Sequence, residues 1–173
     1  MDLKAKIRNI KDFPKKGIVF RDITPLIADG EALKYTIDIM ADYYKDKKID
    51  SILGAEARGF IFGAALAYRL GTGFIPIRKP GKLPYDTCKV SYDLEYGSNV
   101  MEMHVDAIKP GDNILIADDL AATGGTAKAQ AQLVEERGGK VVGFCFLVEL
   151  EFLNPRGLLK GYDVMSLIKY DSE

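Results

Sequence analysis

The sequence predicts an α/β fold with a central, mostly parallel sheet that is flanked by helices. Strand-like apolar segments alternate along the chain with segments whose apolar residues recur at helical spacing. Residues 113–117 are apolar with little alternation, which is typical of a strand covered on both faces in a parallel sheet. At 173 residues the chain has the usual length of one domain, and we expect residues 1–173 to form a single one.

The N-terminal half contains two expected strands and three expected helices. A short amphipathic helix ends where Phe13-Pro14 and Gly17 break it, and an apolar run follows at residues 18–20. One later helix is apolar nearly all round, as a buried helix is. The expected helices span residues 2–10, 30–47 and 59–70, and the expected strands span residues 51–54 and 74–77.

Residues 78–100 differ in character from the segments around them. Basic residues cluster there with Pro and Gly, and Val90, Tyr92 and Leu94 then alternate with polar residues. Alternation of this kind predicts an exposed hairpin. A segment of this length inside a compact domain is usually functional or disordered.

The C-terminal half continues the alternation of strands and helices. After the strand at 113–117 we expect a loop at 118–126 that is rich in acids and glycines, and then a helix that Gly138-Gly139 ends. The remaining expected elements are helices at 127–137 and 156–160 and strands at 140–148 and 164–168. Ligands of such sheets bind beyond the carboxyl ends of the strands, so the segments after Leu53, Ile77 and Ala117 are the candidate site.

Composition and charge exclude several classes of protein. Lys and Arg number 24 and Asp and Glu 25, and this net charge of −1 argues against a nucleic-acid or anionic-membrane binder. The chain starts without a signal peptide, and its apolar runs fall far short of the roughly 20 residues of a membrane span, so we expect a cytoplasmic protein. Cys88 and Cys145 match no metal-ligand spacing, which favours a reducing compartment. The single histidine, His104, excludes a multi-histidine metal centre.

Residues 114–126 are the most informative stretch of the chain. A predicted strand ends in two adjacent carboxylates, Asp118 and Asp119, and Thr123-Gly124-Gly125-Thr126 then opens a helix. Glycines let backbone N–H groups approach an anion, and a helix start adds unpaired N–H donors and the positive end of its dipole. Carboxylates accept hydrogen bonds from vicinal hydroxyls. A ligand with a phosphate at one end and a diol at the other is a ribose 5-phosphate.

A purely structural interpretation of this stretch is that the carboxylates precede a turn and Thr123 caps a helix. The sequence lacks the other common phosphate motifs, Gly-x-x-x-x-Gly-Lys-Ser/Thr and Gly-x-Gly-x-x-Gly. We favour the phosphate interpretation because carboxylates, glycines and threonines occur together in the order that a ribose phosphate requires.

The stretch resembles the 5-phosphoribosyl 1-pyrophosphate (PRPP) signature of type I phosphoribosyltransferases. Three further segments resemble motifs of the adenine-using members, in the right order and over nearly the full length. Residues 54–60 resemble the pyrophosphate loop, residues 17–23 the base-recognition segment, and residues 77–84 and 91–97 the two ends of a flexible catalytic loop. The resemblance implies a type I phosphoribosyltransferase fold with a small N-terminal hood at 1–30, a flexible loop at 78–100 and a cis peptide, Glu56–Ala57.

The resemblance implies roles for individual residues. Glu95 would move the purine proton and Arg58 would stabilise the leaving group, which makes them the catalytic candidates. Phe20 and Leu150 would cover the two faces of adenine, while backbone groups of Val19 and Arg21 read its edge. The full set of implied contacts is Asp118, Asp119, Ala122, Thr123, Gly124, Gly125 and Thr126 for the ribose and its 5′-phosphate; Glu56, Ala57, Arg58, Arg78, Lys79, Lys82 and Tyr96 for pyrophosphate; and Val19, Phe20, Arg21 and Leu150 for adenine.

Each of these residues also has a structural interpretation. On this interpretation Arg58 would be an exposed arginine at a helix start and residues 78–82 would be a solvated basic turn. Glu95 would be a surface glutamate, and residues 18–20 would pack in the core. We expect His104 to be structural or exposed, and the position of Cys88 indicates no redox role.

The implied activity is transfer of the 5-phosphoribosyl group from PRPP to adenine, which gives AMP and pyrophosphate in purine salvage. Mg²⁺ would bridge the pyrophosphate and ribose hydroxyls with no direct protein ligand, and the resemblance implies a homodimer across which Arg78 and Lys82 partly reach the pyrophosphate. Two alternatives stay open at this point. One is a sister transferase that uses another base, and the other is a PRPP-sensing regulator without catalysis.

Overall fold

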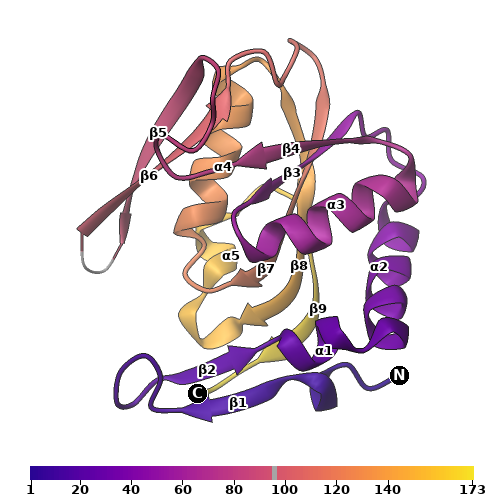
Figure 1. Ribbon diagram of the computed structural model, residues 1–173, viewed down its shortest axis with the longest axis vertical. Coiled ribbons are helices and arrows are strands. Elements are labelled where there is room, and N and C mark those ends of the chain that lie inside the picture. The colour runs from indigo at the N-terminus through magenta and orange to yellow at the C-terminus, as the bar shows by residue number, and fades with distance from the viewer. Residues whose placement is uncertain (95–96) are drawn as a thin grey trace.

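The computed structural model describes residues 1–94 and 97–173, with side-chain detail outside 93–98. Its centre is a parallel sheet of five strands in the order β4-β3-β7-β8-β9 (Figure 1). The strands are β3 (Ser51–Ala55), β4 (Gly73–Ile77), β7 (Asn113–Ala121), β8 (Lys140–Leu150) and β9 (Val164–Tyr170). The predicted α/β class and parallel sheet are confirmed, and all five strands begin within one residue of a predicted strand.

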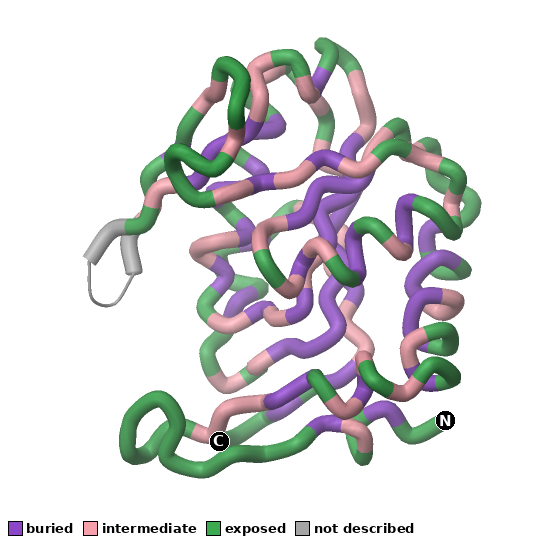
Figure 2. The backbone as a smooth tube through the Cα atoms, viewed as in Figure 1, coloured by how far each residue is buried: buried purple, intermediate pink, exposed green. Residues whose placement is uncertain are grey.

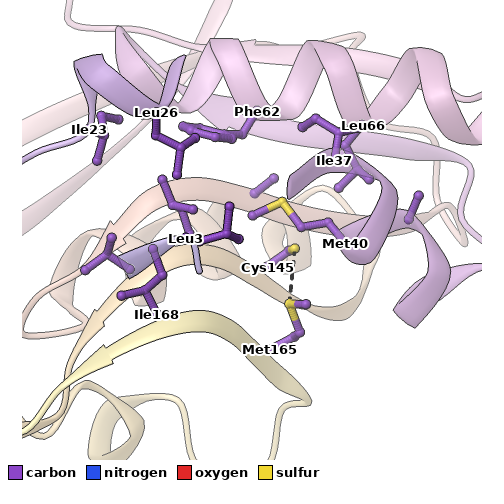
Figure 3. Packing of buried hydrophobic residues seen from close by; sticks show 14 of the residues in the cluster. Leu3, Ile23, Leu26, Ile37, Met40, Phe62, Leu66, Cys145, Met165 and Ile168 are labelled. Atoms are coloured by element: carbon purple, nitrogen blue, oxygen red, sulfur yellow. Dashed lines mark hydrogen bonds between the residues drawn. The ribbon is translucent and has the colours of Figure 1, made fainter. Parts of the chain in front are cut away.

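Helices cover both faces of the sheet and enclose two apolar clusters. The helices α2 (Gly30–Tyr44) and α3 (Arg58–Leu70) lie on one face, and α4 (Gly125–Glu136) lies on the other (Figure 1). Successive residues of a strand point to opposite faces, so Leu115 of β7 joins the first cluster while Ile114 and Ile116 join the second. Figure 3 shows the first cluster, in which Met40 of α2 lies beside Cys145 of β8 and Phe62 of α3 lies beside Leu26. Burial on both faces explains why these strands lack alternation in the sequence.

The N-terminal segment differs from the helix expected at residues 2–10. Only Lys4–Lys6 form a helical turn (η1), and Arg8–Lys11 form a strand, β1, which pairs with β2 (Val19–Asp22). A short helix that was not predicted, α1 (Thr24–Ala28), follows. The expectation was wrong because the four-residue spacing of Leu3 and Ile7, which are both buried in the first cluster, fits a helix. The strand instead depends on partners that lie eight to fourteen residues later in the chain.

A two-stranded hairpin stands apart from the sheet, in the part of the chain where an exposed hairpin was predicted. Its strands are β5 (Thr87–Leu94) and β6 (Gly97–His104), so β6 extends past the predicted end at residue 100. A single bridge between Arg78 and Glu102 ties the preceding loop to β6. Figure 2 shows buried and exposed stretches along this hairpin, and its buried apolar residues Val90, Met101 and Met103 belong to the second cluster. His104, at its end, is half-buried beside the Tyr85 ring, as a structural role would require.

The loop expected at residues 118–126 is shorter than predicted. Strand β7 continues through Ala121, because β8 is long enough to pair Leu120 with Val148 and Ala121 with Glu149. Helix α4 then begins at Gly125, two residues before the predicted start. The chain closes with η2 (Glu151–Leu153) and α5 (Pro155–Leu158) before β9. Within the described ranges, no helix has both the length and the apolar character to cross a membrane.

Candidate active site

A cavity of about 600 Å³ opens at the carboxyl edge of the central sheet. The segments that follow β3 and β4 form one side of it, and the end of β7 with the start of α4 forms the other. Tyr92 and Asn99, which pair across the β5–β6 hairpin, contribute to its rim. The cavity therefore lies where the carboxyl-end rule predicted it from the sequence.

The structure brings together most of the residues implied for the ribose phosphate and the pyrophosphate. Those that line the cavity are Glu56, Ala57, Arg58, Arg78, Lys79, Asp118, Asp119, Ala122, Thr123, Gly124 and Thr126. Gly125 and Lys82 do not line it: Gly125 opens α4, and the carbonyl oxygen of the exposed Lys82 accepts a hydrogen bond from Arg78 Nη1 at 3.1 Å. Glu95 and Tyr96 lie outside the described residues.

The start of α4 forms the anion-binding end of the cavity. Gly124 precedes the helix with a φ of 88°, a left-handed conformation that favours glycine. The hydroxyl oxygen of Thr123 accepts a long hydrogen bond, 3.5 Å, from Gly125 N–H. The first turn of a helix of twelve residues carries N–H groups without helical partners, and Thr126 adds a hydroxyl. This turn therefore has the donors that a phosphate requires.

Asp118 and Asp119 are held at the end of β7 in a low-dielectric environment. Gly59 of α3 allows the approach of Asp118, because a Cβ on Gly59 would lie 2.7 Å from Asp118 Oδ1. The carboxylate of Asp118 accepts hydrogen bonds from Asp119 N–H at 2.9 Å and from Gln130 Nε2 at 3.4 Å. Burial and the neighbouring charge of Asp119 raise the pKa of Asp118 well above its ordinary value. Burial also raises the pKa of Asp119, and the charge of Arg58 opposes that rise.

Two arginines of the cavity are paired with carboxylates. Arg58 Nε lies 2.9 Å from Asp119 Oδ2, and Arg78 Nε lies 2.7 Å from Glu56 Oε2. The other oxygen of Glu56 accepts a hydrogen bond from Lys79 N–H at 2.9 Å, and this bond, more than that from Arg78, lowers the pKa of Glu56. The Glu56–Ala57 peptide bond is cis, as the resemblance implied. The two pairs place cationic donors beside the carboxylates without a large local net charge.

The segment implied for base recognition lies next to the cavity but does not line it. Val19, Phe20 and Arg21 belong to β2, and the Phe20 ring faces the Arg58 guanidinium at 5.4 Å. Arg21 stacks on the Tyr170 ring at 3.9 Å. Leu150, the last residue of β8, is half-buried against the first apolar cluster. Among the described residues, Arg58 thus connects the base-recognition strand with the cavity.

Sequence reasoning missed three polar residues of this region. Tyr92 and Asn99 line the cavity from opposite strands of the β5–β6 hairpin. Gln130 of α4 is completely buried, and its Oε1 has no hydrogen-bond partner. A polar residue in the buried stripe of a helix is a signal that could have drawn attention to Gln130. No comparable signal distinguishes Tyr92 or Asn99, because polar residues alternate along any exposed hairpin.

Comparisons with known proteins agree with this geometry. Residues 26–166 match the family model of the phosphoribosyl transferase domain. A curated adenine phosphoribosyltransferase from Clostridium perfringens is 62% identical to the chain over 171 residues, which cover 99% of both sequences. Another, from Clostridium kluyveri, is 57% identical with the same coverage.

Solved structures give the same result. The chain resembles adenine phosphoribosyltransferase from Thermoanaerobacter pseudethanolicus with a TM-score of 0.95 and 54% identity over 98% of each chain. It resembles the Giardia lamblia enzyme complexed with 9-deazaadenine with a TM-score of 0.93 and 37% identity, covering 99% of this chain and 97% of that one.

The buried carboxylate of Asp118 leads to a prediction about stability. A raised pKa means that the folded chain holds the proton to a higher pH than the unfolded chain, so ionisation of Asp118 lowers the free energy of unfolding as the pH rises. We expect Asp118→Asn to raise that free energy at about pH 8 by about 1 kcal/mol. The gain shrinks toward pH 5. The asparagine can still accept the hydrogen bond from Asp119 N–H. It can also donate a hydrogen bond to Gln130 Oε1 after the side-chain amide of Gln130 rotates to exchange its oxygen and nitrogen. Urea unfolding at the two pH values measures the effect.

Asp50→Asn is the matched control with the opposite sign. Asn113 donates two hydrogen bonds to Asp50 and lowers its pKa, so this carboxylate stabilises the fold above its ordinary pKa and its replacement destabilises the protein near neutral pH. A destabilised Asp118→Asn variant at pH 8 would contradict our account of the buried pair.

Proposed function

Because this chain belongs to the adenine phosphoribosyltransferase family, we infer that its cavity holds PRPP during transfer of the 5-phosphoribosyl group to adenine. The reaction gives AMP and pyrophosphate and salvages a purine base. The observation that carries this assignment to the cavity is that one hollow joins an N–H-rich helix start, two adjacent carboxylates and two arginines. A phosphate, a diol and a pyrophosphate occur together in PRPP, and each needs one of these three chemistries.

We assign the 5′-phosphate to the turn at residues 123–126. Its backbone N–H groups and the hydroxyls of Thr123 and Thr126 supply donors. Asp118 and Asp119 then accept hydrogen bonds from the ribose hydroxyls. When a hydroxyl binds Asp119, it competes with Arg58 for the same carboxylate, and the guanidinium becomes available to the pyrophosphate together with Arg78, Lys79 and Lys82. Charge that develops on the leaving group is stabilised there.

We assign adenine to the space between Phe20 and Leu150, with its edge bound by backbone groups of Val19 and Arg21. Phe20 lies beside Arg58, which supports an adenine position next to the pyrophosphate site. The base must lose a proton as the glycosidic bond forms, and we assign its removal to Glu95. Tyr96 and the rest of residues 78–100 would close over PRPP, which keeps water from hydrolysing it.

Magnesium fits this cavity as a partner of the substrate. No cluster of three potential metal-ligating His, Cys, Asp or Glu side chains occurs among residues 1–94 and 97–173. The described side chains thus offer at most part of the six-oxygen shell that Mg²⁺ prefers, and we propose that PRPP provides its oxygens without a direct protein ligand. When bound, Mg²⁺ neutralises charge on the departing pyrophosphate. We place the reaction in the cytoplasm, where the free thiols of Cys88 and Cys145 stay reduced.

The first test is a base panel. We expect pyrophosphate release from PRPP with adenine, much slower release with hypoxanthine, xanthine or orotate, and loss of release when magnesium is chelated. Phosphate-sensitive coupling or ³¹P spectroscopy measures the product. A preference for hypoxanthine would indicate a sister transferase, and PRPP binding without release for any base would indicate a regulator. The names of the curated relatives do not favour these two alternatives.

The second test addresses the residue roles. We expect Glu95→Ala to lower kcat for AMP formation by about 10²–10⁴-fold, the range of general acid–base catalysis, with the circular dichroism spectrum unchanged. Asp118→Ala removes a ribose contact and should reduce kcat/KM for PRPP sharply. Asp106→Ala, which removes an exposed carboxylate beyond the β5–β6 hairpin, is the control and should behave like the wild type. Wild-type turnover in the first two variants would refute the assignments.

The third test concerns the homodimer. Ile61, Ala64 and Tyr68 form an exposed stripe on α3, and Tyr68 is 91% exposed, which is unusual for a large aromatic residue. We propose that this stripe is buried between two copies of the chain. Tyr68→Glu should then shift sedimentation from dimer to monomer at micromolar concentration, whereas Tyr35→Glu, on the exposed side of α2, should not. A dimer that is unaffected by Tyr68→Glu would place the interface elsewhere.

A further inference from the structure

An ion pair between Glu149 and Arg156 lies beside the proposed phosphate-binding turn and outside the cavity. Glu149, near the end of β8, is 1% exposed, and both of its oxygens accept hydrogen bonds from Arg156, from Nε at 2.7 Å and from Nη2 at 2.8 Å. The remaining Arg156 nitrogen, Nη1, donates to Val164 O at 3.1 Å. The guanidinium therefore joins α5 to two neighbouring strands of the central sheet.

The pair is charged at neutral pH. Burial acts to raise the pKa of Glu149, but the hydrogen bonds and charge of Arg156 bring it below its ordinary value. A bidentate contact between two charged groups fixes distance and orientation more strictly than a single hydrogen bond does. The backbone next to Arg156 is accordingly held in one position relative to β8.

That backbone supports the turn at residues 123–126. Pro155, which precedes Arg156, is buried, and a Cβ on Gly124 would lie 2.7 Å from the Pro155 carbonyl oxygen. Gly124 is the residue that enters α4 in the left-handed conformation. The Pro155 backbone thus packs directly against the residue whose conformation aims the first N–H groups of α4 at the cavity.

We propose that Glu149 and Arg156 are positioning residues for the 5′-phosphate. By holding Pro155 against Gly124, the pair keeps the turn in the conformation that binds phosphate. The proposal rests on the assignment of the 5′-phosphate to this turn. Neither residue lines the cavity, so the effect of replacing them reaches the ligand through the backbone.

The effect should be confined to one end of the substrate. Arg58 and Arg78, assigned to pyrophosphate, are held by Asp119 and Glu56, which belong to other elements than α5. A loosened α5 should therefore weaken binding of ribose 5-phosphate and leave binding of pyrophosphate nearly unchanged. A pair that merely stabilised the fold would affect both ligands alike or neither.

The experiment is titration calorimetry of the full chain with ribose 5-phosphate and, separately, with magnesium pyrophosphate. Arg156→Lys keeps the positive charge but loses the bidentate contact, and Glu149→Gln keeps one hydrogen-bond acceptor for Arg156. We expect either variant to raise the Kd of ribose 5-phosphate about tenfold, and to change the Kd of pyrophosphate less than twofold, since small displacements of a binding group are costly. The KM for PRPP should rise in parallel.

Arg69→Lys is the control, because Arg69 also pairs with a carboxylate, through a single Nε hydrogen bond to Asp38 at 2.8 Å, and it does not line the cavity. It should leave both dissociation constants at the wild-type value. Equal weakening of both ligands by the Glu149 and Arg156 variants, or no weakening of ribose 5-phosphate in a folded variant, would overturn the positioning role alone. If ribose 5-phosphate fails to bind the wild type, the assignment of the turn fails first and the positioning role with it. Thermal unfolding identifies a variant that does not fold. If one of the Arg156→Lys and Glu149→Gln variants fails to fold, the dissociation constants of the other variant test the positioning role.

Discussion

The approach of Gly59 to Asp118 is the constraint on which the cavity depends. A Cβ on Gly59 would lie 2.7 Å from Asp118 Oδ1, so the start of α3 reaches the end of β7 only because residue 59 has no side chain. Strands β3 and β7 are neighbours in the sheet, and α3 begins three residues after β3 ends. The contact therefore brings Arg58 within 2.9 Å of Asp119 and joins two segments that are about sixty residues apart in the sequence.

Charge in the cavity is balanced by pairs. Arg58 is paired with Asp119 and Arg78 with Glu56, which agrees with a chain whose net charge is only −1. In the proposed reaction, substrate groups replace these internal partners: a ribose hydroxyl takes the place of an arginine at a carboxylate, and a pyrophosphate oxygen takes the place of a carboxylate at an arginine. The site then binds a highly charged substrate by exchanging contacts. Long-range attraction by a basic surface is not needed.

Much of the architecture could be predicted from the sequence because it is encoded locally. The strands of the five-stranded sheet are largely apolar runs, and the helices between them have apolar residues at regular spacing. For this reason β3, β4, β8, β9, α2 and α3 were expected close to where they occur. The N-terminal hairpin was missed because β1 is exposed and short, with a burial pattern that carries no alternation, and exists only through pairing with β2. The extension of β7 through Asp118 and Asp119 was missed for a similar reason. Adjacent carboxylates indicate a loop, and only the length of β8 provides the partners that continue the strand.

The site shows the same division between local and tertiary information. By itself, the sequence determined that a glycine- and threonine-rich helix start follows two carboxylates, and that basic residues occur after two other strands, because these features depend on residue order along short segments. Only the tertiary structure decided which of them meet. It placed Arg58 on Asp119 and Arg78 on Glu56, buried Gln130 against Asp118, and set Pro155 against Gly124. Each of these contacts joins residues from different elements, and their distances follow from strand order and packing, which no short stretch of sequence specifies.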